Sequence, residues 1–444
     1  MIQEFFSWFS GILWGPPLLI LLIGTHLFLT IRLKLIQRFV WKGVKLSVSK
    51  DKDSEGDVTQ FGALATALAA TIGTGNIVGV ATAVGLGGPG AVFWMWITGV
   101  LGIATKYSEA LLSVKYRVRT ERGTFLGGPM YVLERGLGVK WLGILFAVFT
   151  ALASFGIGNM VQANSLSALA HDTVGIPTWV SGLVMAVLTA LVILGGVKSI
   201  ARVCSALVPF MAIFYVAGSL VILAYNFDFL GEAVRVIMVG AFNPEALGGG
   251  FAGYMLSAAM RYGVARGLFS NESGLGSAPI VAAAAQTKNP VRQALVSATG
   301  TFWDTVVICL MTGLVLVSSM IRYPDTMVGL KGSALTQAAF SVLPVVGPWI
   351  LSIGLATFVF STILGWSYYG EKAVEYLAGA KALMPYRLLW VIAVFVGATS
   401  ALPLVWDFAD CMNALMALPN ILSLVLLSNV IVAETKTYLW TESN

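Results

Sequence analysis

The chain has 444 residues, of which 57% are hydrophobic and 11% are charged, and its formal net charge is +6. A soluble domain usually carries about twice this fraction of charged residues, so the composition indicates a protein embedded in a membrane. Three dispersed cysteines and two distant histidines leave almost no material for a disulfide framework, a zinc site or a catalytic triad, and we predict that the protein is not an enzyme.

Apolar runs long enough to cross about 30 Å of hydrocarbon recur along the whole chain. We predict eleven membrane-spanning helices near residues 11–33, 61–84, 90–114, 142–168, 178–197, 200–225, 250–282, 293–320, 344–370, 384–402 and 404–433. The predicted fold class is therefore an all-α polytopic membrane protein, surrounded by lipid. Residues 1–444 are expected to form a single transmembrane domain.

The basic residues of the predicted loops lie almost entirely on one side of the membrane. Twenty-one Lys and Arg residues lie in one alternate set of loops and only three in the other. Because cytoplasmic loops are enriched in Lys and Arg, this bias predicts a multi-pass protein of the cell membrane with its N-terminus outside and its C-terminus in the cytoplasm. The positive net charge is thus a topology signal, and no nucleic-acid partner is predicted.

The order of the spans suggests an internal symmetry. An extra helix at 11–33 precedes two groups of five spans, at 61–225 and 250–433. Five spans reverse the starting side, so the second group is inverted relative to the first. Each group opens with a span that is interrupted by glycines and small polar residues. Paired interruptions of this kind are the best sequence indication of the binding site of a secondary transporter.

The first interruption is centred on Gly73 and Gly75, with Thr71, Thr74 and Asn76 around them. A face of small residues for helix packing would explain the glycines but not the three polar side chains. If the helix opens here, the second half-helix presents free N–H groups and the positive end of its dipole, which favour a carboxylate. Carbonyl groups freed on the first half-helix can bind a hard cation such as Na⁺.

The second interruption covers residues 267–277 and contains Glu272, an acid at membrane depth. Such a residue is expected to face protein or water and to be functional. Arg261 and Arg266 on the same span are possible partners of this carboxylate. A buried ion pair that fixes the broken helix and a direct role in ion binding remain equally open.

Other polar groups within the spans are candidates for ligands or for interhelical contacts. Ser361 and Thr362 could give hydroxyl oxygens to Na⁺, with the Phe358 carbonyl one turn earlier, although hydroxyls also bond back to their own helix. Gln162, Asn159 and Asn164 interrupt the span that starts near residue 142, and we expect one of them to face the cavity.

Several charged residues complete the set of polar groups at membrane depth. Lys106 and Glu109 are spaced to pair along one span. The roles of Asp304, Asp407 and Asp410 stay open at this point.

In these motifs the chain resembles the alanine or glycine:cation symporter family, a branch of the amino acid–polyamine–organocation transporters with a LeuT-type fold. The resemblance covers nearly the whole chain. It rests on AATIGTGNI at 69–77, GVARGLFSNE at 263–272, GLGSAP at 274–279 and TILGW at 362–366. It implies a 5+5 inverted repeat with one extra N-terminal helix, and Na⁺-coupled uptake of alanine and glycine.

The resemblance also implies roles for single residues. The implied substrate-binding residues are Thr74, Gly75, Gln162, Gly267, Phe269, Thr362 and Trp366. The implied sodium ligands are Ala69, Ile72, Phe358, Ser361 and Thr362 at one position, with Asn76 and Ser270 at a second position beside the substrate. Na⁺ is the expected coupling ion and a small neutral amino acid the expected partner. No oligomeric state follows from the sequence.

Two alternatives are kept. A proton-coupled carrier, or one of broader specificity, would use an intramembrane acid such as Glu272 as its titrating group. A channel-like protein would conduct without coupling, but a simple pore has no need of paired, inverted helix breaks.

Overall fold

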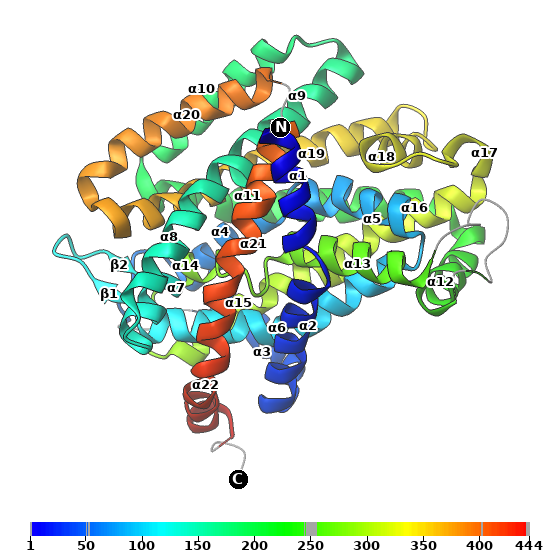
Figure 1. Cartoon of the computed structure of the whole chain (residues 1–444). Coiled ribbons are helices and arrows are strands. Elements are labelled where there is room, and N and C mark those ends of the chain that lie inside the picture. Colours follow the sequence, from blue (N-terminus) through cyan, green and yellow to red (C-terminus); the bar gives the residue numbers. More distant parts are fainter. Residues whose placement is uncertain are drawn as a thin grey trace.

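The computed structural model describes residues 2–49, 51, 54–243, 245, 255–400 and 403–440, and this part of the chain is almost entirely helical (Figure 1). A two-stranded antiparallel hairpin joins β1 (Val118–Arg119) to β2 (Phe125–Leu126). In the labels below, η marks a 3₁₀- or π-helical turn.

The helices of the first half are α1 (Ile2–Leu13), α2 (Pro16–Arg32), η1 (Ile36–Phe39), α3 (Val40–Ser47), α4 (Gln60–Thr71), η2 (Gly75–Gly79), α5 (Val80–Gly87), α6 (Ala91–Lys115), α7 (Pro129–Tyr131), η3 (Val132–Gly136), α8 (Lys140–Phe155), η4 (Gly156–Met160), α9 (Val161–Val174), α10 (Thr178–Ile193) and α11 (Gly196–Tyr225).

The helices of the second half are α12 (Phe227–Phe242), α13 (Leu256–Asn271), α14 (Pro279–Ala282), α15 (Pro290–Thr301), η7 (Phe302–Cys309), α16 (Leu310–Arg322), α17 (Pro324–Met327), α18 (Gly332–Phe340), α19 (Val346–Ala378), η8 (Ala380–Ala382), α20 (Leu383–Thr399), α21 (Pro403–Leu426), α22 (Ser428–Thr435) and η9 (Lys436–Trp440).

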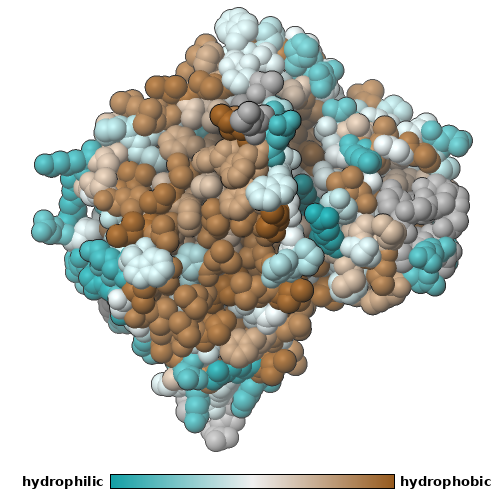
Figure 2. Space-filling model, viewed as in Figure 1, coloured by the Kyte–Doolittle hydropathy of each residue, from teal (hydrophilic) through white to brown (hydrophobic). Residues whose placement is uncertain are grey.

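The described helices are long and apolar enough for a multi-pass membrane protein. Seven continuous helical units qualify as membrane spans, and the pair Gln60–Thr71 and Gly75–Gly87, bent by 53°, makes an eighth. Helices α6, α10 and α13 occupy the three other predicted spans. The face seen in Figure 2 is mostly hydrophobic, as expected of a surface that contacts lipid.

The first span starts earlier than the sequence prediction. The first apolar unit runs over Ile2–Arg32 and not only over 11–33, and it is divided at Gly15. Pro16 and Pro17 follow there at the start of α2, a position where the missing N–H of proline is tolerated. The predicted span ends at 250 and 402 lie outside the described residues, as do Lys50 and Lys52 of the first basic loop.

The helix that carries the Ser361–Thr362 pair lies against the first interruption of the chain. At Gly365 a Cβ atom would stand 2.6 Å from the backbone nitrogen of Ala70, so the missing side chain allows α19 to lie directly on α4. Helices α1 and α21, from the two ends of the chain, lie side by side in Figure 1.

Candidate functional site

The first break in the helix lies between α4 and η2, where the sequence predicts it. Ile72 ends α4 in an extended conformation (φ −77°, ψ 94°). The Asn76 side chain accepts a hydrogen bond of 2.9 Å from the N–H of Gly73, and the Thr74 N–H points at Oε1 of Gln162 at 3.4 Å. The backbone groups freed by the break are thus held by side chains from inside the protein, as a membrane requires.

Five neutral oxygen atoms converge beside this break. The Ser361 hydroxyl donates to the carbonyls of Phe358 (2.9 Å) and Ala69 (3.2 Å), and the Thr362 hydroxyl donates to the carbonyl of Ile72 (3.2 Å). All five residues are buried, with at most 2% of any of them exposed. Carbonyls and hydroxyls are hard oxygen ligands of the kind that bind Na⁺ at discontinuous helices.

A second cluster on the other side of the break contains a carboxylate. Asp304 accepts hydrogen bonds from Asn76 (2.6 Å), Ser270 (3.0 Å) and Thr305 (2.6 Å), and it is fully buried. The resemblance pointed to Asn76 and Ser270 but left Asp304 without a role. The signal that could have included it is the presence of an acid at membrane depth.

The second break follows α13, which remains helical through Asn271. Glu272 then adopts the left-handed conformation (φ +54°), followed by Gly274 (+91°) and Gly276 (+86°), before α14 starts at Pro279. The two glycines reach positive φ values readily, whereas Glu272 adopts one as a non-glycine residue at the end of α13. Together with Glu272 they interrupt the helix between Asn271 and Pro279.

The prediction that Glu272 pairs with Arg261 or Arg266 is wrong. Its carboxylate accepts a hydrogen bond from the Ser277 hydroxyl within the unwound segment, and neither Arg261 nor Arg266 forms an ion pair with it. The reason is geometric: Glu272 stands where the helix ends, so its side chain turns toward the break and away from the preceding turns of α13.

Glu109 is the functional group that sequence reasoning did not place here. Its Oε1 accepts from the N–H groups of Gly274 (3.0 Å) and Gly276 (3.1 Å) and from Nδ2 of Asn420 (2.7 Å). The expected pair with Lys106 is not formed as a direct salt bridge, and the Lys106 ammonium has no hydrogen-bond partner among the described residues. Glu109 instead binds the N–H groups that the break leaves free, and so stabilises the unwound segment.

The predicted substrate residues of the two breaks face each other. A Cβ atom on Gly75 would lie 3.4 Å from the Phe269 ring, and one on Gly73 would lie 2.6 Å from the Thr362 hydroxyl. Gly267 also packs closely against α6, because a Cβ atom there would stand 2.2 Å from the Thr98 hydroxyl. Its position serves close packing of α13 on α6.

Trp366 lies one turn beyond Thr362 and is almost fully buried, with 1% exposed. Its ring contacts the edge of Tyr369, with 5.5 Å between the centroids, and a Cβ atom on Gly158 would collide with it at 2.1 Å. The indole also lies beside Glu272. Trp366 therefore packs between η4 and the second break.

Of the three amides in the fourth span, Gln162 contacts the break. Asn159 donates to the Trp390 carbonyl, and Asn164 donates to the carbonyls of Gly397 and Ser400. One amide thus faces the site while the other two hold α20, as the sequence predicts. The π-helical turn η4 lies immediately before Gln162, and such turns are frequent at functional sites.

Outside the spans, Asp57 fastens the segment that leads into α4. Its carboxylate accepts from the N–H of Phe125 at 2.9 Å, and its own N–H donates to the carbonyl of Ala284. Burial raises the pKa of Asp57 above its ordinary value, and the hydrogen bond from Phe125 partly offsets this shift. The contact joins the β-hairpin, the start of α4 and the end of the second break.

Comparisons with known proteins find similar sequences and a similar fold. The model of the sodium:alanine symporter family matches residues 1–444. A protein of Methanococcus maripaludis described as sodium/alanine symporter AgcS is 52% identical over 97% of this chain and 95% of its own. The probable sodium/glutamine symporter GlnT of Bacillus subtilis is 38% identical over 97% and 89%.

A solved structure of similar fold is that of MhsT in complex with L-phenylalanine. It has 14% sequence identity, covers 87% of this chain and 95% of its own, and gives a TM-score of 0.62. At this identity the likeness concerns the fold alone. It confirms the predicted LeuT-type, all-α membrane fold.

Proposed function

Because this chain belongs to the sodium:alanine symporter family, we propose that it carries a small neutral amino acid, alanine or glycine, across the cell membrane together with Na⁺ by alternating access. The protein is a membrane transporter and not an enzyme. The observation that carries the proposal is the convergence of five buried oxygen atoms, from α4 and α19, beside the first break.

One Na⁺ is assigned to those five oxygens. In the present geometry the hydroxyls of Ser361 and Thr362 direct their protons at the carbonyls of Ala69 and Ile72. Rotation of each hydroxyl about its C–O bond would turn its lone pairs inward, so that donor groups become ligands without movement of the backbone. The site thus couples the position of α4 to that of α19.

A second cation position is assigned to Asn76, Ser270 and Asp304. The three side chains already converge through hydrogen bonds to the carboxylate. A cation here would offset the cost of burying that charge, which is expensive without a partner. Asp304 also supports the second candidate function, proton coupling, more directly than Glu272 does, because it contacts residues of both breaks.

The amino acid is assigned to the space between the breaks. Its carboxylate is placed at Thr74 and Gly75, where η2 begins and leads into α5, and where the helix dipole favours negative charge. Its ammonium is placed near the C-terminal end of α13, which has the opposite polarity. Phe269 covers the substrate, while Gln162, Thr362 and Trp366 surround it and leave room for a small side chain.

The energetics suit a nutrient transporter. One Na⁺ moving down 100 mV yields about 2.3 kcal/mol, and a tenfold gradient adds about 1.4 kcal/mol. One-to-one coupling could therefore concentrate a neutral amino acid roughly several hundredfold.

Uptake of labelled alanine into liposomes containing the purified protein tests the proposal. An inward Na⁺ gradient should drive accumulation, and replacement of Na⁺ by choline at the same pH should abolish it. Accumulation that follows a pH gradient without Na⁺ would favour proton coupling through Asp304. Flux that never exceeds equilibration under any gradient would favour a channel.

A further inference from the structure

A group of basic residues follows directly after the first membrane-spanning unit. Arg32 is the last residue of α2, and Lys34, Arg38, Lys42 and Lys45 come next, before the end of α3. No acidic residue occurs from position 5 to position 50 of the sequence. None of the five basic residues forms an ion pair within the part of the chain that the structure describes. We call these five residues the basic surface.

Helix α3 presents the basic surface outward and packs by its other side. Of the five basic residues, Arg32 is half-buried and the other four are exposed. Val40, Gly43 and Ser47 form the buried side of α3, and a Cβ atom on Gly43 would stand 2.3 Å from the carbonyl oxygen of Leu295. This close approach seats α3 directly on α15. The spacing of three or four residues on each side is that of an amphipathic helix.

Large apolar side chains lie exposed between the basic ones. The exposed fractions are 62% for Leu35, 62% for Trp41 and 77% for Val48. Helices that lie in the plane of the membrane interface combine Lys and Arg with exposed Trp and Leu in this way, and Trp is enriched at the level of the headgroups. A soluble polyanion such as a nucleic acid would neutralise the charges but leave these apolar side chains in water.

The C-terminal segment holds the basic surface in place. Arg32 donates hydrogen bonds to the Ser428 hydroxyl (3.1 Å) and to Oδ1 of Asn429 (2.6 Å). The Lys34 ammonium lies 4.6 Å from the centroid of the Trp440 ring. Helices α3 and α22 accordingly lie at the same end of the molecule (Figure 1). Because these side chains are already ordered, the binding of an anion costs little further conformational entropy.

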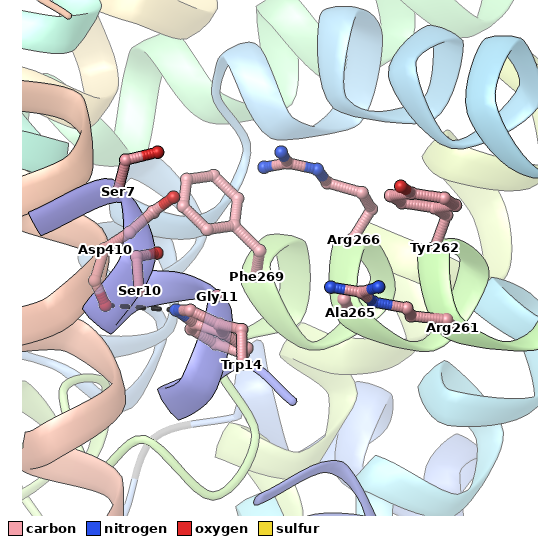
Figure 3. A pocket seen from close by; sticks show the side chains of 10 residues that line it. All are labelled: Ser7, Ser10, Gly11, Trp14, Arg261, Tyr262, Ala265, Arg266, Phe269 and Asp410. Atoms are coloured by element: carbon pink, nitrogen blue, oxygen red, sulfur yellow. Dashed lines mark hydrogen bonds between the residues drawn. The ribbon is translucent and has the colours of Figure 1, made fainter. Parts of the chain in front are cut away.

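Other basic side chains of the protein lie beside an acid of the chain itself. Arg261 and Arg266 line a pocket between α1, α13 and α21, and Asp410 lines the same pocket (Figure 3). The basic surface has no such neighbour on its own segment. On the adjoining α22, Glu434 is already paired with Lys115, so the counter-charge of the basic surface has to come from outside the chain.

We propose that the basic surface binds the headgroups of anionic phospholipids, while Leu35, Trp41 and Val48 enter the boundary between the headgroups and the acyl chains. The phosphodiester oxygens accept charge-assisted hydrogen bonds from the guanidinium and ammonium groups. Each Lys or Arg beside an anionic membrane contributes a factor of roughly five in binding. Since α3 is seated on α15, the bound lipids also hold α15 at the membrane interface. The inference is independent of the proposed substrate and coupling ion, because it rests only on the membrane fold and on this surface.

Fluorescence quenching by labelled lipids tests the proposal. Val48→Cys places a thiol at the exposed end of α3, whereas the three native cysteines are buried. The thiol carries a bimane fluorophore, and the protein is placed in nanodiscs of phosphatidylcholine. A small fraction of phosphatidylglycerol, or of phosphatidylcholine, with the same spin-labelled acyl chain is added as the quencher. Phosphatidylglycerol should quench several-fold more strongly at low ionic strength, and the difference should shrink at high salt because ions screen the charges.

Removal of charge from the surface provides the variant and its control. Arg38→Gln, Lys42→Gln and Lys45→Gln combined should make the two quenchers equal, since three factors of roughly five are lost. The matched control removes the same number of charges from exposed positions on the same predicted side of the membrane: Arg122→Gln, Lys288→Gln and Lys381→Gln. This control should keep the preference for phosphatidylglycerol.

Equal quenching by the two lipids when the basic surface is intact would overturn the proposal, and this measurement requires no charge variant. A preference that survives removal of the three surface charges, or that is lost in the control, would overturn it as well, because the lipids would then gather through the overall charge of the protein. Suppression of the preference by glycerol phosphate at constant ionic strength would also overturn it, and would assign the basic surface to a soluble anion.

Discussion

Thr362→Val removes one oxygen from the five that converge beside the first break and replaces it with a methyl group of similar size. The Thr362 hydroxyl is buried and lies 3.2 Å from the Ile72 carbonyl. An interaction of such an oxygen with a charged partner is worth about 1.5–3 kcal/mol, and the hydrogen bond that it makes without the ion about 0.5–1.5 kcal/mol. The difference of about 1–1.5 kcal/mol predicts a half-saturating Na⁺ concentration roughly tenfold higher.

The assay is alanine uptake into proteoliposomes over a range of Na⁺ concentrations at saturating alanine. Thr357→Val is the matched control, because Thr357 lies on the same helix but bonds only to the carbonyls of Ile353 and Gly354 in its own chain segment. The control should leave the Na⁺ dependence unchanged. If Thr362→Val also stays within twofold of the unaltered protein, the five oxygens are not a sodium site.

Three other changes test separate parts of the account. Gly75→Val should abolish uptake even when the variant reaches the membrane in normal amounts, because its Cβ would already contact the Phe269 ring at 3.4 Å and its two methyl groups would occupy space between the breaks; normal uptake would refute the open-helix site. Asp304→Asn should raise the half-saturating Na⁺ concentration at least tenfold, as expected for loss of a charged ligand, and an unchanged value would leave Asp304 a purely structural role. Burial raises the pKa of Asp57, so its ionised form costs stability above that pKa and the cost vanishes below the ordinary pKa. Asp57→Asn, which keeps an acceptor for Phe125, should therefore raise the Tm more at pH 8 than at pH 3, which lies below the ordinary pKa of 3.8; an equal change at both pH values would contradict this reasoning.

The sequence predicted those features that follow from the physics of a helix in lipid. The spans follow from apolar length, and the first break follows from Gly73 and Gly75 among polar side chains, where the structure interrupts the helix. The fold class also followed from these patterns and from the family resemblance. The inverted repeat boundaries, the orientation of the termini and the roles of single site residues stay predictions.

The features that could not be predicted from the sequence depend on contacts between distant segments of the chain. The substrate-binding role of Gly267 stays a prediction, but its close packing against Thr98 of α6 could not be foreseen, because it depends on a residue far away in the sequence. Glu109 was expected to pair along its own helix. It binds instead the N–H groups of Gly274 and Gly276, which are freed by a break more than 160 residues away in sequence. Spacing along one helix cannot reveal a donor supplied by another.

The central claim is that Na⁺ and the amino acid cross together through the two breaks. Its most direct test is the entry of radioactive sodium into proteoliposomes with and without external alanine, with the membrane potential held at zero. The account predicts that alanine stimulates sodium entry in a fixed ratio to its own uptake, and that Gly75→Val abolishes both fluxes. Alanine uptake without accompanying sodium entry would contradict it.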